Sequence, residues 1–259
     1  MAAYTAIDDP ESYFQTVTYT GNATARDITL PGTNDMQPDF VWLKKTDTEV
    51  EGHKLFDSVR GATNLLQTSS TGAEQDQDTS LTAFNSDGFS LGIDSGEIVN
   101  DDGVGMVGWC WKAGTTSGIT TNAGTTITPS GYSFSQDAGF ALIKYSGNGT
   151  AGAKVAHGMG KVPKFIITKR IDEGAESWTT FHAGIGNTKF LNFNSTSAAG
   201  TATNRWNDTD PDTVNFTLGS EGSVNASSQP LMAWCFANSQ GYQKCGTYIG
   251  NNNADGVFV

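Results

Sequence analysis

The sequence predicts an all-β protein made of two tandem antiparallel β-sandwiches, followed by the start of a third. Three observations favour this fold class. Glycine occurs 31 times in 259 residues, and only 16% of the residues are charged. Short runs of β-branched and aromatic residues alternate with turn residues along the whole chain. The third observation is an internal repeat, which requires the fold to be analysed copy by copy.

The internal repeat is clearest around a rare Trp-Cys pair. Trp109 and Cys110 return 125 residues later as Trp234 and Cys235. The same offset relates residues 40–45 to 165–170 and residues 56–61 to 181–186. Each copy has about 100 residues, which is enough to bury a core of its own. The predicted core residues of the two copies are Phe40, Trp109, Cys110, Phe165, Trp234 and Cys235.

The first copy, residues 17–114, is predicted to form seven or eight short strands. Its first strand, residues 17–21, alternates β-branched and aromatic residues and ends in a turn at Gly21. In the last strand, Gly108 beside Trp109 predicts burial on both faces, with the glycine letting the opposing sheet approach. This number of strands is typical of a two-sheet antiparallel sandwich. The other strands are expected at 27–30, 40–44, 54–59, 65–69, 81–84, 89–92 and 106–111.

The remaining segments are assigned from the repeat. Residues 1–16 are predicted to be an N-terminal arm, and residues 141–240 the second sandwich. Residues 115–140 are rich in Gly, Ser and Thr and have no counterpart after the second Trp-Cys pair, which predicts a linker with room for one strand. Residues 246–251 repeat the Tyr-Thr-Gly-Asn opening of the copies. Residues 241–259 are therefore expected to be the opening strands of a third repeat or a tail that docks in an oligomer.

The charge of the chain limits its partners. A formal net charge of −12 repels a phosphate backbone and anionic lipid, so neither nucleic acid nor membrane insertion is expected. No apolar run approaches the roughly 18 residues of a membrane span. The first residues carry acids where a signal peptide has bases and an apolar core. We therefore expect synthesis in the cytoplasm without a signal peptide.

The three cysteines predict neither a disulfide framework nor a metal site. Cys110 and Cys235 hold the same position in each copy and are flanked by aromatic residues, which indicates two buried thiols, one per core. Cys245 has no counterpart at this spacing. A tetrahedral metal site needs CxxC or HxxxH pairs, and the sequence has none. No cofactor is expected.

Several longer motifs carry a resemblance to a known family. They are SLTAFNSDGFSLG at 80–92, GWCWKAG at 108–114, YSGNG at 145–149, LMAWCFANSQGYQKCG at 231–246 and YIGNNNADGVFV at 248–259. Together they resemble the β-sandwich repeats of bacteriophage virion proteins, marine phages especially, which are described as tail-fibre or host-recognition proteins. The resemblance implies a jelly-roll fold similar to concanavalin-like lectins and glucanases. It also implies a virion location, other virion proteins as partners, and a homo-oligomer, a trimer in the case of a fibre.

An acidic cluster is the first candidate for chemistry. Glu74, Asp76 and Asp78 would face one way on a strand, as in sandwich-fold glucanases, where paired carboxylates act as acid and nucleophile. Glutamines rather than apolar residues separate them, and the second copy has no acids at 200–203. We interpret the cluster as a solvated loop.

The histidines and the last asparagines are weaker candidates. His53, His157 and His182 accompany no nucleophile motif and no clustered aspartate, so we predict no catalytic residues and no enzyme. Residues 251–256 match the first half of a calcium loop without its closing glutamate, which favours a hairpin turn.

Two tryptophans are the candidates for ligand binding, because sugar rings stack on aromatic faces. Trp178 and Trp206 have the non-aromatic counterparts His53 and Leu81, so the shared fold does not require them. They are candidate contacts for a host-surface glycan. A core role is nevertheless favoured, since tryptophan is usually largely buried.

Two classes of function follow from the sequence. The first is a non-enzymatic structural and adhesive protein of a bacteriophage virion, either a tail fibre or another surface-exposed component, that contributes to host attachment. The alternative is a carbohydrate-binding lectin module, or a capsid decoration or head-fibre protein. A glucanase-type hydrolase is disfavoured.

Overall fold

The computed structural model describes residues 5–47, 52–172, 176–254 and 256. In the first half a short turn of 3-10 helix, η1 (Pro10–Ser12), leads into strands that follow the β-branched and aromatic runs of the sequence. The strands are β1 (Phe14–Thr20), β2 (Arg26–Thr29), β3 (Phe40–Lys45), β4 (Lys54–Asp57), β5 (Gly61–Gln67), β6 (Gln75–Asp76), β7 (Leu81–Asn85), β8 (Gly88–Leu91) and β9 (Gly105–Trp111).

The second half has the same kind of strands and two helices of one turn each. The strands are β10 (Gly131–Ser135), β11 (Phe140–Ser146), β12 (Ala153–Ala156), β13 (Pro163–Arg170), β14 (Thr179–His182), β15 (Lys189–Asn192), β16 (Gly200–Thr201), β17 (Asn215–Leu218) and β18 (Pro230–Ala237). The helices are α1 (Thr203–Trp206) and α2 (Gly222–Asn225). Within the described ranges, no helix has the length and apolar character needed to cross a membrane.

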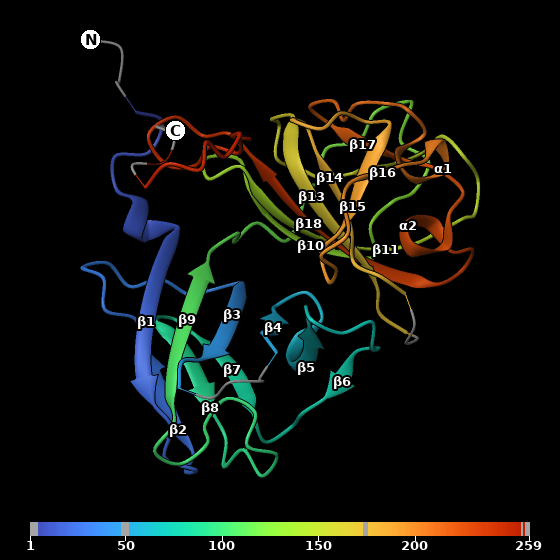
Figure 1. The fold of residues 1–259 in the computed structure, drawn as a ribbon. Coiled ribbons are helices and arrows are strands. Elements are labelled where there is room, and N and C mark those ends of the chain that lie inside the picture. The colour runs from blue at the N-terminus through green and yellow to red at the C-terminus, as the bar shows by residue number, and fades with distance from the viewer. Residues whose placement is uncertain (1–4, 48–51, 173–175, 255, 257–259) are drawn as a thin grey trace.

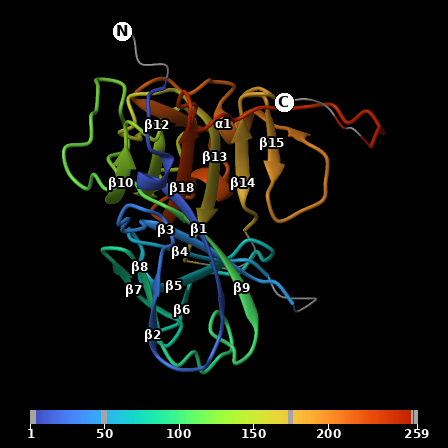
Figure 2. The ribbon, with the colours of Figure 1, turned by 90° about the vertical axis from the view of Figure 1, so that its left-hand side faces the viewer.

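Each half is an antiparallel β-sandwich, which confirms the predicted all-β sandwich fold. The first half has one sheet in the order β1-β9-β3-β4-β5-β6 and a second in the order β2-β8-β7. The second half has a large sheet in the order β10-β11-β18-β13-β14-β15-β16 and a small one of β12 and β17. Figures 1 and 2 show the two halves as adjoining bodies.

The strand registers repeat with the offset found in the sequence. In the first half Trp42 of β3 lies opposite Trp109 of β9. In the second half Ile167 of β13 lies opposite Trp234 of β18, 125 residues further along in both strands. The matching segments of the sequence therefore occupy matching positions in the two large sheets.

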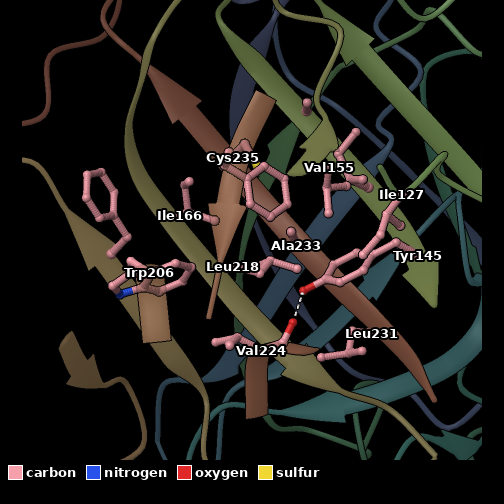
Figure 3. Close-up of a cluster of buried hydrophobic side chains, with 14 of the residues drawn as sticks. Ile127, Tyr145, Val155, Ile166, Trp206, Leu218, Val224, Leu231, Ala233 and Cys235 are labelled. Carbon is pink, nitrogen blue, oxygen red and sulfur yellow. Dashed lines mark hydrogen bonds between the residues drawn. The ribbon is translucent and has the colours of Figure 1, made fainter. Parts of the chain in front are cut away.

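A buried asparagine also recurs in both halves. The Nδ2 group of Asn100 donates to the carbonyl oxygens of Thr24 at 2.8 Å and of Gly92 at 2.9 Å. Asn225 makes the same bonds in the second half, to Thr150 at 3.0 Å and Gly219 at 2.8 Å. The nearby tyrosines also match, since Tyr19 donates to the carbonyl of Val99 and Tyr145 to that of Val224. Figure 3 shows the bond of Tyr145 within the second core.

Three apolar cores hold the chain together, and they separate four layers of strands. One core lies inside each sandwich; Cys110 belongs to the first and Cys235 to the second. The third core lies between the two large sheets and contains Phe40, Trp178 and Trp234. The middle strands of these sheets are thus covered on both faces, which explains the nearly continuous apolar run of β18. The two sandwiches are packed face to face.

The predicted role of Gly108 is wrong. A Cβ atom at this position would lie 2.9 Å from the side chain of Leu43 and 3.2 Å from that of Val17. Both residues belong to the strands that flank β9 in the same sheet. The glycine makes room for side chains of its own sheet rather than for an opposing sheet.

Part of the predicted linker is integral to the second sandwich. Strand β10 pairs with β11, and Ile127 and Phe134 are buried in the second core. The prediction of one strand in this segment is confirmed, whereas the boundary at residue 141 is wrong. Repeat matching misses these residues because the first sandwich has no strand next to β1 on that side among the described residues.

Ile7 of the N-terminal arm is buried in the third core, so the described part of the arm is packed rather than loose. No strand forms at 247–249, where a third opening strand was predicted. Tyr248 and Ile249 are 72% and 88% exposed, because no sheet edge pairs with them within the described chain.

Candidate functional site

A hollow lined by aromatic side chains opens at the seam between the two sandwiches. Its volume is about 500 Å³. Both halves of the chain contribute to its wall. The lining residues are Trp42, His53, Thr68, Ser69, Phe193, Asn194, Ser195 and Thr196.

The strands of the first large sheet position the tryptophan of this hollow. Along β3, Val41 and Leu43 point into the first core, so Trp42 lies on the opposite face together with Phe40 of the third core. Trp42 is half-buried at the rim of that third core. Its neighbour across the ladder, Trp109, is half-buried as well.

The second half supplies the opposite wall from the segment after β15. The N–H of Phe193 donates to the carbonyl of Trp178 at 2.8 Å, and the side-chain oxygen of Asn194 accepts from the N–H of Trp178 at 3.0 Å. These bonds fix the segment to a residue that is itself fully buried. Phe193 remains 37% exposed and faces the hollow.

Trp42 meets three rings edge-on. Its centroid lies 5.6 Å from His53 at an interplanar angle of 80°, 6.4 Å from Trp109 at 74°, and 5.8 Å from Phe193 at 73°. His53 stacks on Trp109 at 6.4 Å and 23°. Such edge-to-face and offset contacts are the favoured arrangements of aromatic pairs. The cluster is therefore a preformed apolar surface.

A hydrogen bond fixes the tautomer of the histidine. The indole Nε1 of Trp42 donates to Nδ1 of His53 at 2.7 Å, so neutral His53 carries its proton on Nε2. Burial lowers the pKa of His53, and the nearby charge of Lys44 lowers it further. The hollow thus presents a neutral imidazole at pH 7.

Among the described residues, the lining of the hollow is aromatic, hydroxyl and amide in character, with no carboxylate, lysine or arginine. Aromatic faces bind apolar C–H surfaces, and hydroxyl and amide groups bind uncharged polar groups. The arrangement can hold an uncharged ligand that has both kinds of surface.

The structure does not bring Trp178 and Trp206 to the surface, so their candidate role as glycan contacts is wrong. Trp178 is fully buried in the third core, and its Nε1 donates to the carbonyl of Ser70 at 2.9 Å. Trp206 is 1% exposed in the second core, 5.8 Å from Phe181 (Figure 3). A ring enclosed by protein cannot stack on a sugar, and the core role favoured by the sequence is the observed one.

The other predicted core residues divide between the three cores. Cys110 and Cys235 are buried free thiols inside separate sandwiches, as predicted, and burial raises the pKa of both. Phe40 and Trp234 lie in the third core, against which Phe165 packs half-buried. The prediction is wrong only for Trp109, which lies beside the hollow because its side of the seam stays open.

The acidic cluster has a structural role at its first residue. Nη1 of Arg60 donates a hydrogen bond to Oε2 of Glu74 at 3.0 Å. Arg60 in turn forms a fully buried ion pair with Asp57, with Nε 2.6 Å from Oδ2. Asp76 and Asp78 are exposed, as expected for a solvated segment, but Asp76 lies in strand β6, which pairs with β5, so the prediction of a loop is wrong there.

The remaining candidates take part in structural hydrogen bonds. His157 is buried, and its Nε2 lies 3.1 Å from the carbonyl oxygen of Asp212. Asn251 accepts a bond from the N–H of Asn253, and the N–H of Gly256 donates to the carbonyl of Asn253. These bonds form a local turn, but no paired strands flank it among the described residues, so a hairpin is not formed there. Across the described ranges, no three His, Cys, Asp or Glu side chains come close enough to share a metal ion.

The fold and the site define an antiparallel β-sandwich protein with an aromatic surface site. A family described as a domain of unknown function, DUF7483, matches residues 9–259, and the chain belongs to this family. No curated protein and no solved structure matches the chain.

Sequence reasoning missed the hollow because its residues come from four distant segments. One signal was available. Trp42 aligns with Ile167 in the second copy, so an aromatic residue stands where the shared fold accepts an aliphatic one. The same argument applied to Trp178 and Trp206 gave buried residues, which shows that the signal does not separate surface from core.

Proposed function

We propose that this protein is a non-enzymatic structural and adhesive component of a bacteriophage virion that contributes to host attachment. The aromatic hollow carries this proposal, because a preformed surface of Trp42 and Phe193 at an open seam suits the binding of an external ligand. The resemblance of the sequence motifs to virion repeats is the reason for proposing a location in a phage virion.

The way the halves are joined supports an adhesive role. The third core couples the two sandwiches through side chains such as Phe40 and Trp234, whose rings are 6.2 Å apart. A hydrogen bond from Trp178 to Ser70 crosses the same interface. A site at such an interface keeps its shape only while both halves stay packed, and rigid elements hold binding residues more precisely than loose domains do.

Antibody fragments raised against the purified chain test the proposal on the phage that encodes it. We expect gold-labelled fragments to decorate intact particles and to slow their adsorption to host cells. Fragments against an internal virion protein serve as the control. Particles without label, or adsorption that is unchanged by saturating label, would contradict the proposal. The position of the gold on tail, baseplate or capsid distinguishes a tail fibre from a capsid decoration or head-fibre protein.

A further inference from the structure

The hollow is the open counterpart of a buried aromatic pair. Trp178 and Trp234 pack in the third core as a tilted pair, with centroids 5.4 Å apart and an interplanar angle of 33°. At an offset of 125 residues their positions are held by His53 and Trp109, which stack at 6.4 Å and 23°. The first pair is fully buried, whereas the second is half-buried.

The surfaces that face these two pairs also correspond. Ser70 of the first half covers Trp178 and accepts its indole hydrogen bond. The residue 125 positions later is Ser195, which lines the hollow near His53. Equivalent segments therefore contact equivalent aromatic pairs at both ends of the seam. Only the end with Trp178 and Trp234 is closed by packing. The end with His53 and Trp109 contains the hollow, which has a volume of about 500 Å³.

We propose that this open end binds a neutral saccharide, with Phe193 as the stacking ring for one pyranose and Trp42 as the apolar wall beside it. The C–H face of a pyranose is apolar and flat, and it matches exposed aromatic rings. Its hydroxyl groups need donors and acceptors around the rim. The inference rests on the proposed function and names the class of ligand for the same site.

Hydrogen-bonding groups around the rim suit such a ring. Neutral His53 offers its Nε2 proton, since its Nδ1 already accepts from Trp42. Asn194 uses its side-chain oxygen for Trp178, and its amide nitrogen has no partner within the described residues. Ser69 and Thr196 are exposed and add hydroxyl groups that can donate or accept.

The charge of the protein selects neutral sugars over acidic ones. The part of the lining that the structure describes holds no lysine or arginine to pair with a carboxylate or a sulfate. A net charge of −12 also repels an anionic ligand before it arrives. Uronic-acid and sialylated chains are therefore expected to bind much more weakly than neutral hexose chains.

Calorimetric titration of the full chain tests the inference. The probes are neutral oligosaccharides of glucose, galactose or mannose and a matched set that contains uronic acids. We expect binding of at least one neutral probe, weakened roughly tenfold or more by Phe193→Ala. Tyr248→Ala is the matched control, because Tyr248 is an exposed aromatic residue far from the hollow in sequence, and it should bind as the parent does. Trp42→Phe is a second variant that keeps the packing while it removes the bond to His53.

Two outcomes overturn the inference, namely the absence of binding to every neutral probe at millimolar concentration, and equal binding by the parent chain and Phe193→Ala. The host-cell experiment stays separate. Labelled virions whose adsorption is slowed would support the adhesive function. Sugar binding that is unchanged by Phe193→Ala in the same protein would contradict only the saccharide site. Sugar binding that depends on Phe193, in a protein that is absent from virions, would support the saccharide site and contradict the proposed virion location.

Discussion

Trp42 donates a hydrogen bond to His53, and this bond exists only while Nδ1 of the histidine is unprotonated. Burial of His53 lowers its pKa in the folded protein below the usual value near 6.5. The folded state therefore disfavours the protonated form, while the unfolded chain takes up a proton freely. The contribution of His53 to stability is complete above about pH 6.5 and is lost as the pH falls through the folded pKa.

We expect this loss to be absent from the variant His53→Gln. The measurement is urea denaturation of parent and variant between pH 7.5 and pH 5, with the difference between them assigned to His53. His157 is also buried with a lowered pKa, but it is present in both proteins and cancels in the comparison. A difference that does not change with pH would show that the histidine is not held neutral by its bond to Trp42.

The ion pair beneath the seam is expected to be costly to break. Arg60 and Asp57 are both fully buried, and the guanidinium also donates to the carbonyl oxygens of Leu55 and Asn64. Replacing Arg60 by alanine leaves a buried carboxylate unpaired, which should lower the free energy of unfolding by about 3–5 kcal/mol. Glu74→Gln is the control, because Glu74 is partly exposed and its loss should cost about 1 kcal/mol or less. Equal losses in the two variants would argue against this assignment.

Two tryptophans at equivalent positions should differ in their effect on stability. Trp234 is fully buried in the third core, whereas Trp109 is half-buried beside the hollow. Trp234→Ala should therefore lower the free energy of unfolding by about 3–5 kcal/mol, and Trp109→Ala by clearly less. Chemical denaturation of both variants measures the difference. A larger loss for Trp109 would mean that the open end of the seam is packed in solution.

The buried asparagines should behave alike because their hydrogen bonds are alike. Asn100 and Asn225 are fully buried, and the side chain of each connects two carbonyl groups. Alanine at either position should cost about 1–3 kcal/mol for each buried group left unpaired. Parallel denaturation of the two variants tests this, and a loss confined to one of them would show that the two sandwiches do not depend on the same network.

Thiol labelling can report on burial in each sandwich. Burial raises the pKa of Cys110 and Cys235, and neither side chain is exposed. Cys245 is partly exposed, although burial raises its pKa as well. In the native protein we expect a disulfide reagent to label Cys245 first and the other two only after unfolding. Rapid native labelling of all three thiols would contradict the two separate cores.

Much of the fold could be predicted from the sequence because the sandwich motif occurs twice in the chain. The Trp109 and Trp234 positions, the strand pairs around them and the buried thiols all follow from the 125-residue offset. The offset says nothing about how the two copies meet. The sequence predicts Trp234 in the core of its own copy and Phe140 in the linker, yet both are buried against the other sandwich. This face-to-face packing depends on surfaces formed by residues that are far apart in the sequence.

The candidate site was missed for the same reason. Phe193 comes next to Trp42 and His53 only when the two large sheets pack against each other. No local sequence pattern predicts this packing. The tryptophans that the sequence singled out differ between the copies for two reasons. Trp206 fills the second core where Leu81 fills the first, whereas Trp178 fills the third core where its counterpart His53 lines the hollow. A difference between copies thus marks a change of environment, and the structure is needed to tell burial from exposure.

The indole N–H signals of the tryptophans offer the most direct test of the binding site at the seam. The chain has six tryptophans, so each signal can be assigned by single replacement with phenylalanine. On titration with a neutral oligosaccharide that binds, we expect the signals of Trp42 and Trp109 to move, while those of the buried Trp178, Trp206 and Trp234 stay in place. Saturation with the sugar that leaves Trp42 and Trp109 unchanged would contradict a ligand site in the hollow.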